Sequence, residues 1–136
     1  MKKGLLFVLA AATLLLSGCH RGKNISVQRN VVTRIEIECE YQGYRFRRQY
    51  TSPEKMRLVL FYIRSVRSPF TVEPGEDAHT GSNLRITTVS ADETTKTYHQ
   101  MADRYFQEGR NGWEKIDPEK AAKLWDVILT TPSDPE

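Results

Sequence analysis

Histidine and cysteine are the residues of this chain best suited to acid–base, nucleophilic or metal chemistry. His20, His79 and His99 lie far apart in the sequence, without the short His or Cys spacings that bind zinc. There is also no Gly-x-Ser-x-Gly segment for a nucleophilic serine and no glycine-rich phosphate loop. The sequence therefore predicts no catalytic residues, no metal, no cofactor and no enzymatic activity, with an unrecognised hydrolase site as the alternative.

The densest group of potential metal ligands is acidic. It comprises Glu73, Glu76, Asp77 and His79, in a segment that also carries Pro74-Gly75. Its spacing matches no calcium-binding loop, and no second histidine lies nearby. We therefore expect the segment from Phe70 to Asn83 to be a solvated loop.

The N-terminus has the features of an export signal. Lys2 and Lys3 precede an almost wholly apolar run from Gly4 to Leu16, which is too short to span a membrane as a helix. Such a run is typical of the central region of a secretory signal peptide. Residues 1–18 are therefore predicted to be removed, His20 to Asn30 to form a polar tether, and residues 31–136 to form a single domain.

The residues Leu16-Ser17-Gly18-Cys19 that follow the apolar run resemble the lipobox of bacterial lipoproteins. The resemblance implies a diacylglyceryl group on Cys19, cleavage before it, and acylation of the new amino terminus. Several acyl chains give stable anchoring where one does not. The expected location is extracytoplasmic and lipid-anchored, or the outer membrane in a Gram-negative source. An ordinary cleaved signal with a chance cysteine is the alternative.

The charge is balanced overall but uneven along the chain. The whole sequence carries +3, and loss of Lys2 and Lys3 leaves 18 basic and 17 acidic residues. This composition argues against nucleic acid as a partner. Residues 19–72 carry a net +7 and residues 73–136 a net −6. The two halves either face one another in the fold or are displayed to a partner.

The arginine-rich stretch Tyr44–Tyr50 is best explained as half of a hairpin. Val31 to Tyr41 alternates apolar and charged residues, which predicts a strand with one buried face. A loop at Gln42-Gly43 then sets the register, because a slip of one residue would bury a charge. The expected pairs are Glu40 with Arg45, Glu38 with Arg47, Glu36 with Gln49, Tyr41 with Tyr44, Cys39 with Phe46, Ile37 with Arg48 and Ile35 with Tyr50.

Two residues of this hairpin are exceptional. Cys39 falls on the apolar face and is predicted to be a buried, unreactive thiol, because a reactive one needs an open, basic setting. Arg48 falls on the same face opposite Ile37. It either lies at a sheet edge with its charged head in water or marks a functional site.

Two helices are expected, each opened by a similar string. Ser52-Pro53-Glu54-Lys55 and Asp117-Pro118-Glu119-Lys120 provide capping residues and a proline at the first helical position. The first helix runs to about Arg67, where Leu58, Phe61 and Tyr62 widen its apolar stripe and predict heavy burial. The stripe of the second helix, which ends before Pro132, comprises Ala121, Leu124, Trp125 and Ile128.

The remaining strands complete the expected fold. Leu84–Ser90 and Thr95–Ala102 are predicted to pair through a turn near Asp92-Glu93, with His99 near Ile86. Residues 103–109 are open between strand and helical turn, and Asn111-Gly112 predicts a turn before a strand at Trp113–Ile116. The fold class is α+β, an antiparallel sheet of about four to six strands with two helices on one face. Two hairpin–helix halves, related by duplication or by convergence of capping sequences, would fit this pattern.

The candidate partner-binding residues are Trp113, Tyr105 and Arg48, because exposed aromatics and arginines are favoured at interfaces. The lipobox, the Gly112–Asp117 run and the Pro132–Asp134 ending also resemble small, uncharacterised lipoproteins of Gram-positive bacteria. That resemblance implies no particular activity. The function expected is a lipid-anchored interaction module of the cell envelope that binds an envelope protein. A carbohydrate- or wall-binding module is the alternative, with Trp113 as a stacking platform.

Overall fold

The computed structural model describes residues 31–79 and 81–135. The predicted signal segment, Cys19 and the tether lie outside the described residues. The six strands are β1 (Val32–Tyr41), β2 (Tyr44–Tyr50), β3 (Asn83–Ser90), β4 (Thr95–Met101), β5 (Tyr105–Glu108) and β6 (Glu114–Lys115). The helices are α2 (Pro53–Val66), the short η1 (Glu76–His79) and α3 (Pro118–Thr130).

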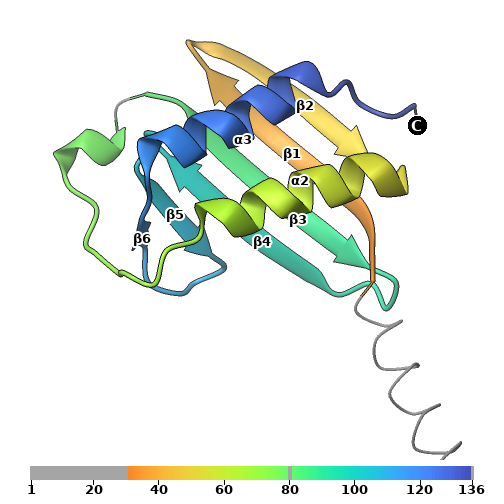
Figure 1. The fold of residues 1–136 in the computed structure, drawn as a ribbon, viewed down its shortest axis with the longest axis horizontal. Coiled ribbons are helices and arrows are strands. Elements are labelled where there is room, and N and C mark those ends of the chain that lie inside the picture. Colours follow the sequence, from red (N-terminus) through yellow and green to blue (C-terminus); the bar gives the residue numbers. More distant parts are fainter. Residues whose placement is uncertain (1–30, 80, 136) are drawn as a thin grey trace, which may run out of the picture. The chain divides into compact units, whose positions relative to one another are not determined.

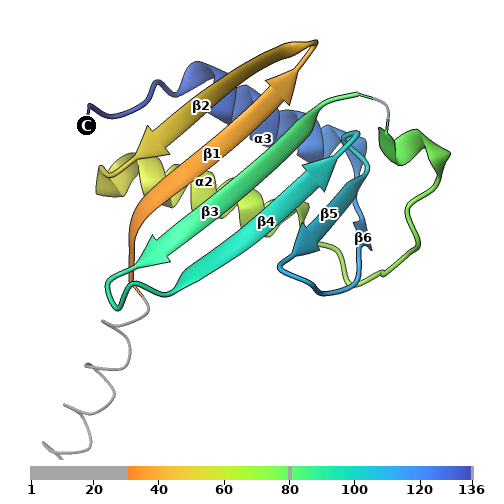
Figure 2. The same cartoon turned by 180° about the vertical axis from the view of Figure 1, so that it is seen from behind.

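The strands form one antiparallel sheet in the order β2-β1-β3-β4-β5-β6. Helices α2 and α3 lie side by side across one face of this sheet (Figure 1). The opposite face carries no helix, as the view from behind shows (Figure 2). The predicted α+β class and the position of both helices are confirmed.

Alternation along the strands builds the core between the sheet and the helices. The isoleucines and leucines of β1 and β3 point toward the helices, while the charged residues between them point away. Both helices bury the apolar stripe predicted for them. The fully buried aliphatic residues are Ile35, Ile37, Val59, Ile63, Val66, Leu84, Ile86, Leu124 and Ile128.

The predicted register of the first hairpin is confirmed at every position. Glu40 pairs with Arg45, Glu38 with Arg47, Cys39 with Phe46, and Ile37 with Arg48. The loop residues Gln42 and Gly43 both take a positive φ, of 50° and 84°. Such a two-residue loop matches the twist of the strands it joins, so the hairpin closes without a bulge.

The start of α2 depends on the far end of the chain. The side chain of Ser52, at the N-cap position, makes no capping hydrogen bond, so that prediction is wrong. Instead Asp134 accepts hydrogen bonds from the backbone N–H groups of Thr51 and Ser52, both at 2.8 Å, and pairs with Lys55 at 2.9 Å. The hydrogen bond from Lys55, with those from the two N–H groups, holds the pKa of Asp134 well below its usual range.

The helix α2 is less buried than its composition predicts. Leu58 is 41% exposed and Phe61 is 63% exposed, so the expectation of heavy burial is wrong for these two residues. The sheet and α3 cover only one stripe of α2, formed by Met56, Val59, Ile63 and Val66. Leu58 and Phe61 lie on the far side of that stripe and face solvent.

Two turns differ from the prediction. In the β3–β4 loop, Asp92 accepts hydrogen bonds from the N–H and hydroxyl of Thr94, and Glu93 takes a positive φ of 68°. The loop is thus centred on Asp92, which shifts the register by one and pairs Ile86 with Tyr98 instead of His99. The last hairpin turns at Gly109, with a φ of 56°, and not at Asn111-Gly112.

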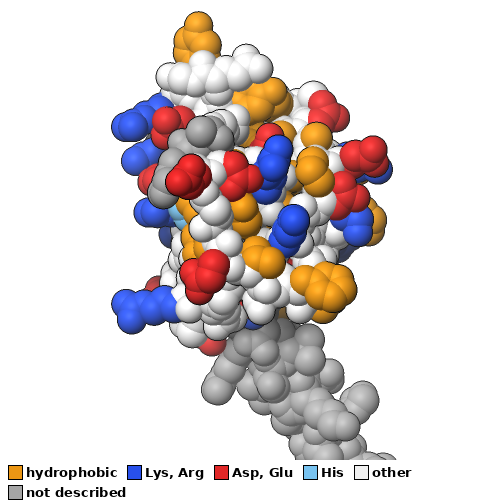
Figure 3. All heavy atoms as spheres, turned by 90° about the vertical axis from the view of Figure 1, so that its left-hand side faces the viewer, with side chains coloured by type: hydrophobic (Ala, Val, Ile, Leu, Met, Phe, Trp, Pro, Cys, Tyr) orange, Lys and Arg blue, Asp and Glu red, His pale blue; other side chains and the backbone are white. Residues whose placement is uncertain are grey.

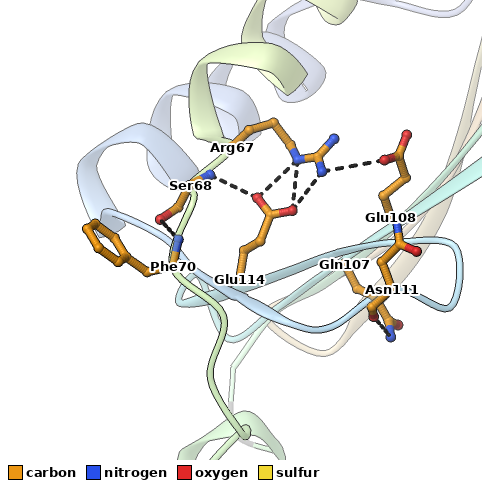
Figure 4. Close-up of polar contacts among 7 residues, drawn as sticks. All are labelled: Arg67, Ser68, Phe70, Gln107, Glu108, Asn111 and Glu114. Carbon is orange, nitrogen blue, oxygen red and sulfur yellow. Dashed lines mark hydrogen bonds and ion pairs between the residues drawn. The ribbon is translucent and has the colours of Figure 1, made fainter.

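Ion pairs join the basic and acidic halves of the chain at both ends of α2. Lys55 pairs with Asp134 near its start, and Arg67 pairs with Glu114 and Glu108 at its end (Figure 4). Other pairs stay within one half, such as that of Arg104 with Asp77. The halves therefore face one another only in part. The two predicted hairpin–helix halves are also unequal, since two strands precede α2 and four lie between α2 and α3.

Candidate functional site

The face of the sheet without helices, hereafter the open face, carries one polar row across five strands. Arg47 of β2 pairs with Glu38 of β1, Glu38 with Arg85 of β3, Arg85 with His99 of β4, and His99 with Gln107 of β5. Directly paired residues lie on the same side of a sheet, about 5 Å apart. The row therefore places residues from both halves of the chain on one surface.

The open face is hollowed around this row. The hollow has a volume of about 630 Å³ and crosses four strands from the outer strand β2 to β4. Arginines, glutamates and a histidine dominate its walls, so it is suited to a polar or charged ligand. Its lining residues are Glu38, Cys39, Glu40, Arg45, Phe46, Arg47, Asn83, Arg85 and His99.

The charged side chains that line the hollow make long ion pairs or none within the described residues. Arg45 lies 3.7 Å from Glu40, and Arg47 lies 3.5 Å from Glu38. Arg85 is exposed and makes no ion pair within 4.0 Å to any described residue, although Glu38 is its cross-strand neighbour. Figure 3 views the molecule edge-on and shows several Lys and Arg side chains projecting from the sheet side. The hollow thus offers arginine N–H groups to a ligand.

His99 lines the hollow on the β4 side, and Trp113 lies beside it. Their ring centroids are 5.3 Å apart, and both side chains are half-buried. Partial burial lowers the pKa of His99, and the positive charge of Arg85 lowers it further. His99 is therefore largely neutral at pH 7. It makes no hydrogen bond to a carboxylate within the described part of the chain, so no acid–base pair is assembled around it.

The structure separates the three predicted partner-binding residues. Trp113 lies beside His99, which lines the hollow, but is not itself a lining residue. Tyr105 is buried, accepts a hydrogen bond from the N–H of Gly75 at 3.2 Å and donates one to Asp77 at 2.8 Å. Arg48 lies on the helix side of the edge strand and donates to the carbonyl of Ile128 at 3.1 Å. Tyr105 and Arg48 thus have structural partners, and a binding role for them stays a prediction.

The residues considered for catalysis and metal binding do not form a second site. Cys39 is buried, and burial raises the pKa of its thiol to about 12, so the thiol is protonated at neutral pH. Among the described residues, no group of His, Cys, Asp and Glu is arranged to hold a metal ion. Asp77 of the acidic segment pairs with Arg104 at 3.1 Å.

Sequence reasoning did not identify Arg85, and it placed His99 opposite the wrong residue. The pattern that could have found the row is the alternation of Asn83, Arg85 and Thr87 with the apolar residues of β3. Alternation assigns them to the polar face, but only the pairing of β1 with β3 brings Arg85 to Glu38.

Comparisons of the chain with protein-family models, curated proteins and solved structures find no match. Within the described residues, α2 and α3 are too short and too polar to serve as membrane spans. The geometry of the open face is therefore the ground for a functional proposal.

Proposed function

We propose that this protein is a lipid-anchored interaction module of the bacterial cell envelope, which binds a partner protein through the open face of its sheet. The lipobox at Leu16–Cys19 supports the anchor, and the polar residues 20–30 support a tether between lipid and domain. Acylation of Cys19 would hold the domain on the outer surface of the cell membrane.

The observation that carries the proposal is the hollow on the open face. Both helices pack on the other side of the sheet (Figure 2), so neither of them covers the hollow. Arg85 lines the hollow and makes no ion pair with any described residue, and Trp113 lies beside His99, which also lines it. Arginine and tryptophan contribute disproportionately to binding energy at protein interfaces. Neither residue is part of the buried core, so both are available to a partner.

A carbohydrate- or wall-binding module is the second candidate. The position of the half-buried Trp113 beside His99 favours it, because a flat aromatic ring can stack on a sugar face. The mixed charges of the hollow favour a protein instead, since Glu38 and Glu40 would repel a uniformly anionic polymer. A hydrolase remains the third reading, with His99 as its candidate base.

The test of the interaction is capture from an envelope extract. Residues 20–136 would be immobilised through the N-terminus, and retained proteins and wall polymers identified. We expect one specific protein to be retained, and to be lost with Arg85→Ala or Trp113→Ala. The matched control is Arg57→Ala, because Arg57 is exposed on α2, away from the open face. Retention that is indifferent to Arg85 and Trp113, or no retention, would overturn the proposed surface.

The test of the anchor uses the full chain expressed in a bacterium. The wild-type protein should partition into the detergent phase and carry acyl chains on the residue that begins the mature chain. Cys19→Ala should abolish both properties. Detergent partitioning that survives Cys19→Ala would refute lipid anchoring at this residue.

A further inference from the structure

The outer edge of β2 is only partly covered. No strand lies beyond β2 in the sheet. The C-terminal segment runs along the end of this edge, where the N–H of Gln49 donates to the Ser133 hydroxyl at 3.0 Å. The N–H of Asp134 in turn donates to the carbonyl of Gln49 at 2.8 Å. The C-terminal segment thus serves as a short neighbouring strand for one part of β2.

The rest of the edge is unpaired. Backbone groups of every second residue point to the same side of a strand, so Arg47 and Arg45 face outward as Gln49 does. Among the described residues, nothing hydrogen-bonds the outward N–H and C=O groups of these two arginines. An unpaired edge of this kind is a template for an incoming strand.

The side chains beside this free edge are cationic and poorly satisfied. Arg45 and Arg47 are 84% and 83% exposed on the open face, and their contacts with Glu40 and Glu38 are long. A guanidinium has five N–H donors, so each arginine can bind a second carboxylate without releasing the first. A second hollow, of about 320 Å³ and lined by Arg47, Gln49, Ser133 and Asp134 among others, gives an added strand room beside the tail.

We propose that β2 accepts an extended acidic segment of the partner protein as an added strand along Arg45 and Arg47. The segment would continue the edge from the point where the C-terminal tail leaves it. Acidic residues at alternate positions would then lie beside the two arginines on the open face. This inference rests on the proposed function for taking the partner to be a protein, and it adds the mode of binding and the chemistry of the segment.

The charges argue against a second copy of this chain on the same edge. Antiparallel pairing of two β2 strands about Phe46 would set Arg45 of one copy opposite Arg47 of the other. Like charges directly opposite one another destabilise a sheet. A sulfate- or phosphate-bearing polymer would match the arginines but would supply no peptide backbone to pair with the free backbone positions.

The test uses ¹⁵N-labelled residues 20–136, which contain every described element and the whole described core. The probe is a five-residue peptide with blocked ends and the sequence TEVET. We expect it to shift the amide signals of Arg45 and Arg47 and to slow their hydrogen exchange at least about tenfold. The peptide TKVKT should have no such effect, and neither should TEVET with N-methylated backbone amides.

Three outcomes would overturn the proposal. They are unchanged amides at Arg45 and Arg47, equal binding of the N-methylated peptide, and a concentration-dependent dimer that protects the same two amides. Unchanged amide signals would exclude an added strand. Equal binding of the N-methylated peptide would show that charge alone drives the interaction. A protective dimer would show that a second copy of the chain pairs with the edge of β2. Heparin serves as the polymer probe, and the same amide protection by heparin would also count against a peptide strand.

A charge-removing variant sharpens the test. Arg45→Gln combined with Arg47→Gln should weaken TEVET binding roughly tenfold, because two cross-strand ion pairs are lost. Arg57→Gln is the matched control and should bind as the wild type does. The TEVET peptide could fail to bind while the envelope extract yields a partner whose retention depends on Arg85. In that case the proposed added strand is wrong and the proposed function stands.

Discussion

The two faces of the sheet are built from the same strands but differ in burial and in the chemistry of their side chains. In β1, Ile37 is 1% exposed beneath the helices, whereas its neighbour Glu38 faces solvent on the open face. The covered face excludes water from large aliphatic side chains, which is the main source of stability. The open face buries little, and its ion pairs are long and exposed. The main stabilising contacts thus lie on one side of the sheet, and the proposed binding surface lies on the other.

Two of the polar residues on the covered face, Glu114 and Gln100, differ in whether their side chains have hydrogen-bond partners. Glu114 accepts hydrogen bonds from the Arg67 guanidinium at 2.7 Å and from the Ser68 N–H at 2.8 Å (Figure 4). Gln100 is 1% exposed, and both polar atoms of its side chain lack a partner among the described residues. A paired buried group stabilises a fold, whereas an unpaired one destabilises it. Substitutions of Glu114 and Gln100 should therefore change the stability of the protein in opposite directions.

The largest effect is expected from truncating the covered face. Ile37→Ala should lower the free energy of unfolding by about 3 kcal/mol, because it removes buried methyl groups and leaves a cavity. Glu38→Ala, one residue along, should change it by less than about 0.5 kcal/mol. Urea denaturation of the two variants measures both values. Similar losses from the two substitutions would break the distinction between the faces.

The second effect concerns the buried ion pair. Glu114→Gln should cost about 2 kcal/mol, because it removes the nearer of the two carboxylates that pair with the half-buried Arg67. Burial alone would raise the pKa of Glu114, but the hydrogen bonds from Arg67 and Ser68 outweigh it and hold the pKa below its ordinary value.

The sign of the pH dependence follows from that lowered pKa. The ionised carboxylate stabilises the fold above the unfolded-state pKa of about 4.3, and the stabilisation is lost as the pH falls through the folded-state value. The difference in stability between wild type and Glu114→Gln should therefore be full near neutral pH and shrink in acid. A difference that grows in acid would contradict this assignment.

The third effect has the opposite sign. Gln100→Met should stabilise the protein by about 1 kcal/mol, because a side chain of similar length replaces two unpaired polar atoms. Thermal unfolding monitored by circular dichroism would show a higher Tm. Loss of stability would mean that the Gln100 amide is satisfied in solution, and the contrast with Glu114 would then disappear.

The smallest effect belongs to the open face. A double-mutant cycle on Glu38 and Arg47 should give a coupling of about 0.2–0.5 kcal/mol that fades with added salt. Its size reports how firmly Arg47 is held by its own hairpin. A coupling above about 1.5 kcal/mol would mean that Arg47 is already engaged, which would weaken the case for a second carboxylate there.

The hairpin register could be predicted because, from Ile35 to Cys39, each residue of β1 belongs clearly to one face. Isoleucines and glutamates alternate strictly, so a slip of one residue would bury a charge. The β3–β4 register could not be predicted, because threonines occur on both faces of β3 and the side chain of Asp92 shifts the centre of the loop. The hydrogen bonds of the Asp92 side chain within the turn thus fixed the β3–β4 register, which the pattern of polar and apolar residues did not specify.

The candidate site could not be predicted from local sequence patterns, for a different reason. Its row joins Glu38 to Arg85 across the β1–β3 pairing, which connects segments separated by a helix and a loop. Alternation assigns each residue to a face but does not say which strands become neighbours. The docking of Asp134 on the start of α2 is hidden in the same way, since a short polar tail carries no periodic pattern.

The position of Asp134 has a consequence for the order in which the chain can fold. The N–H groups before α2 and the edge carbonyl of Gln49 find their partners only in the last few residues of the sequence. While the C-terminus is still being synthesised, the first hairpin and α2 lack these contacts. Residue 134 must therefore be synthesised before the start of α2 and the edge of β2 can acquire these contacts.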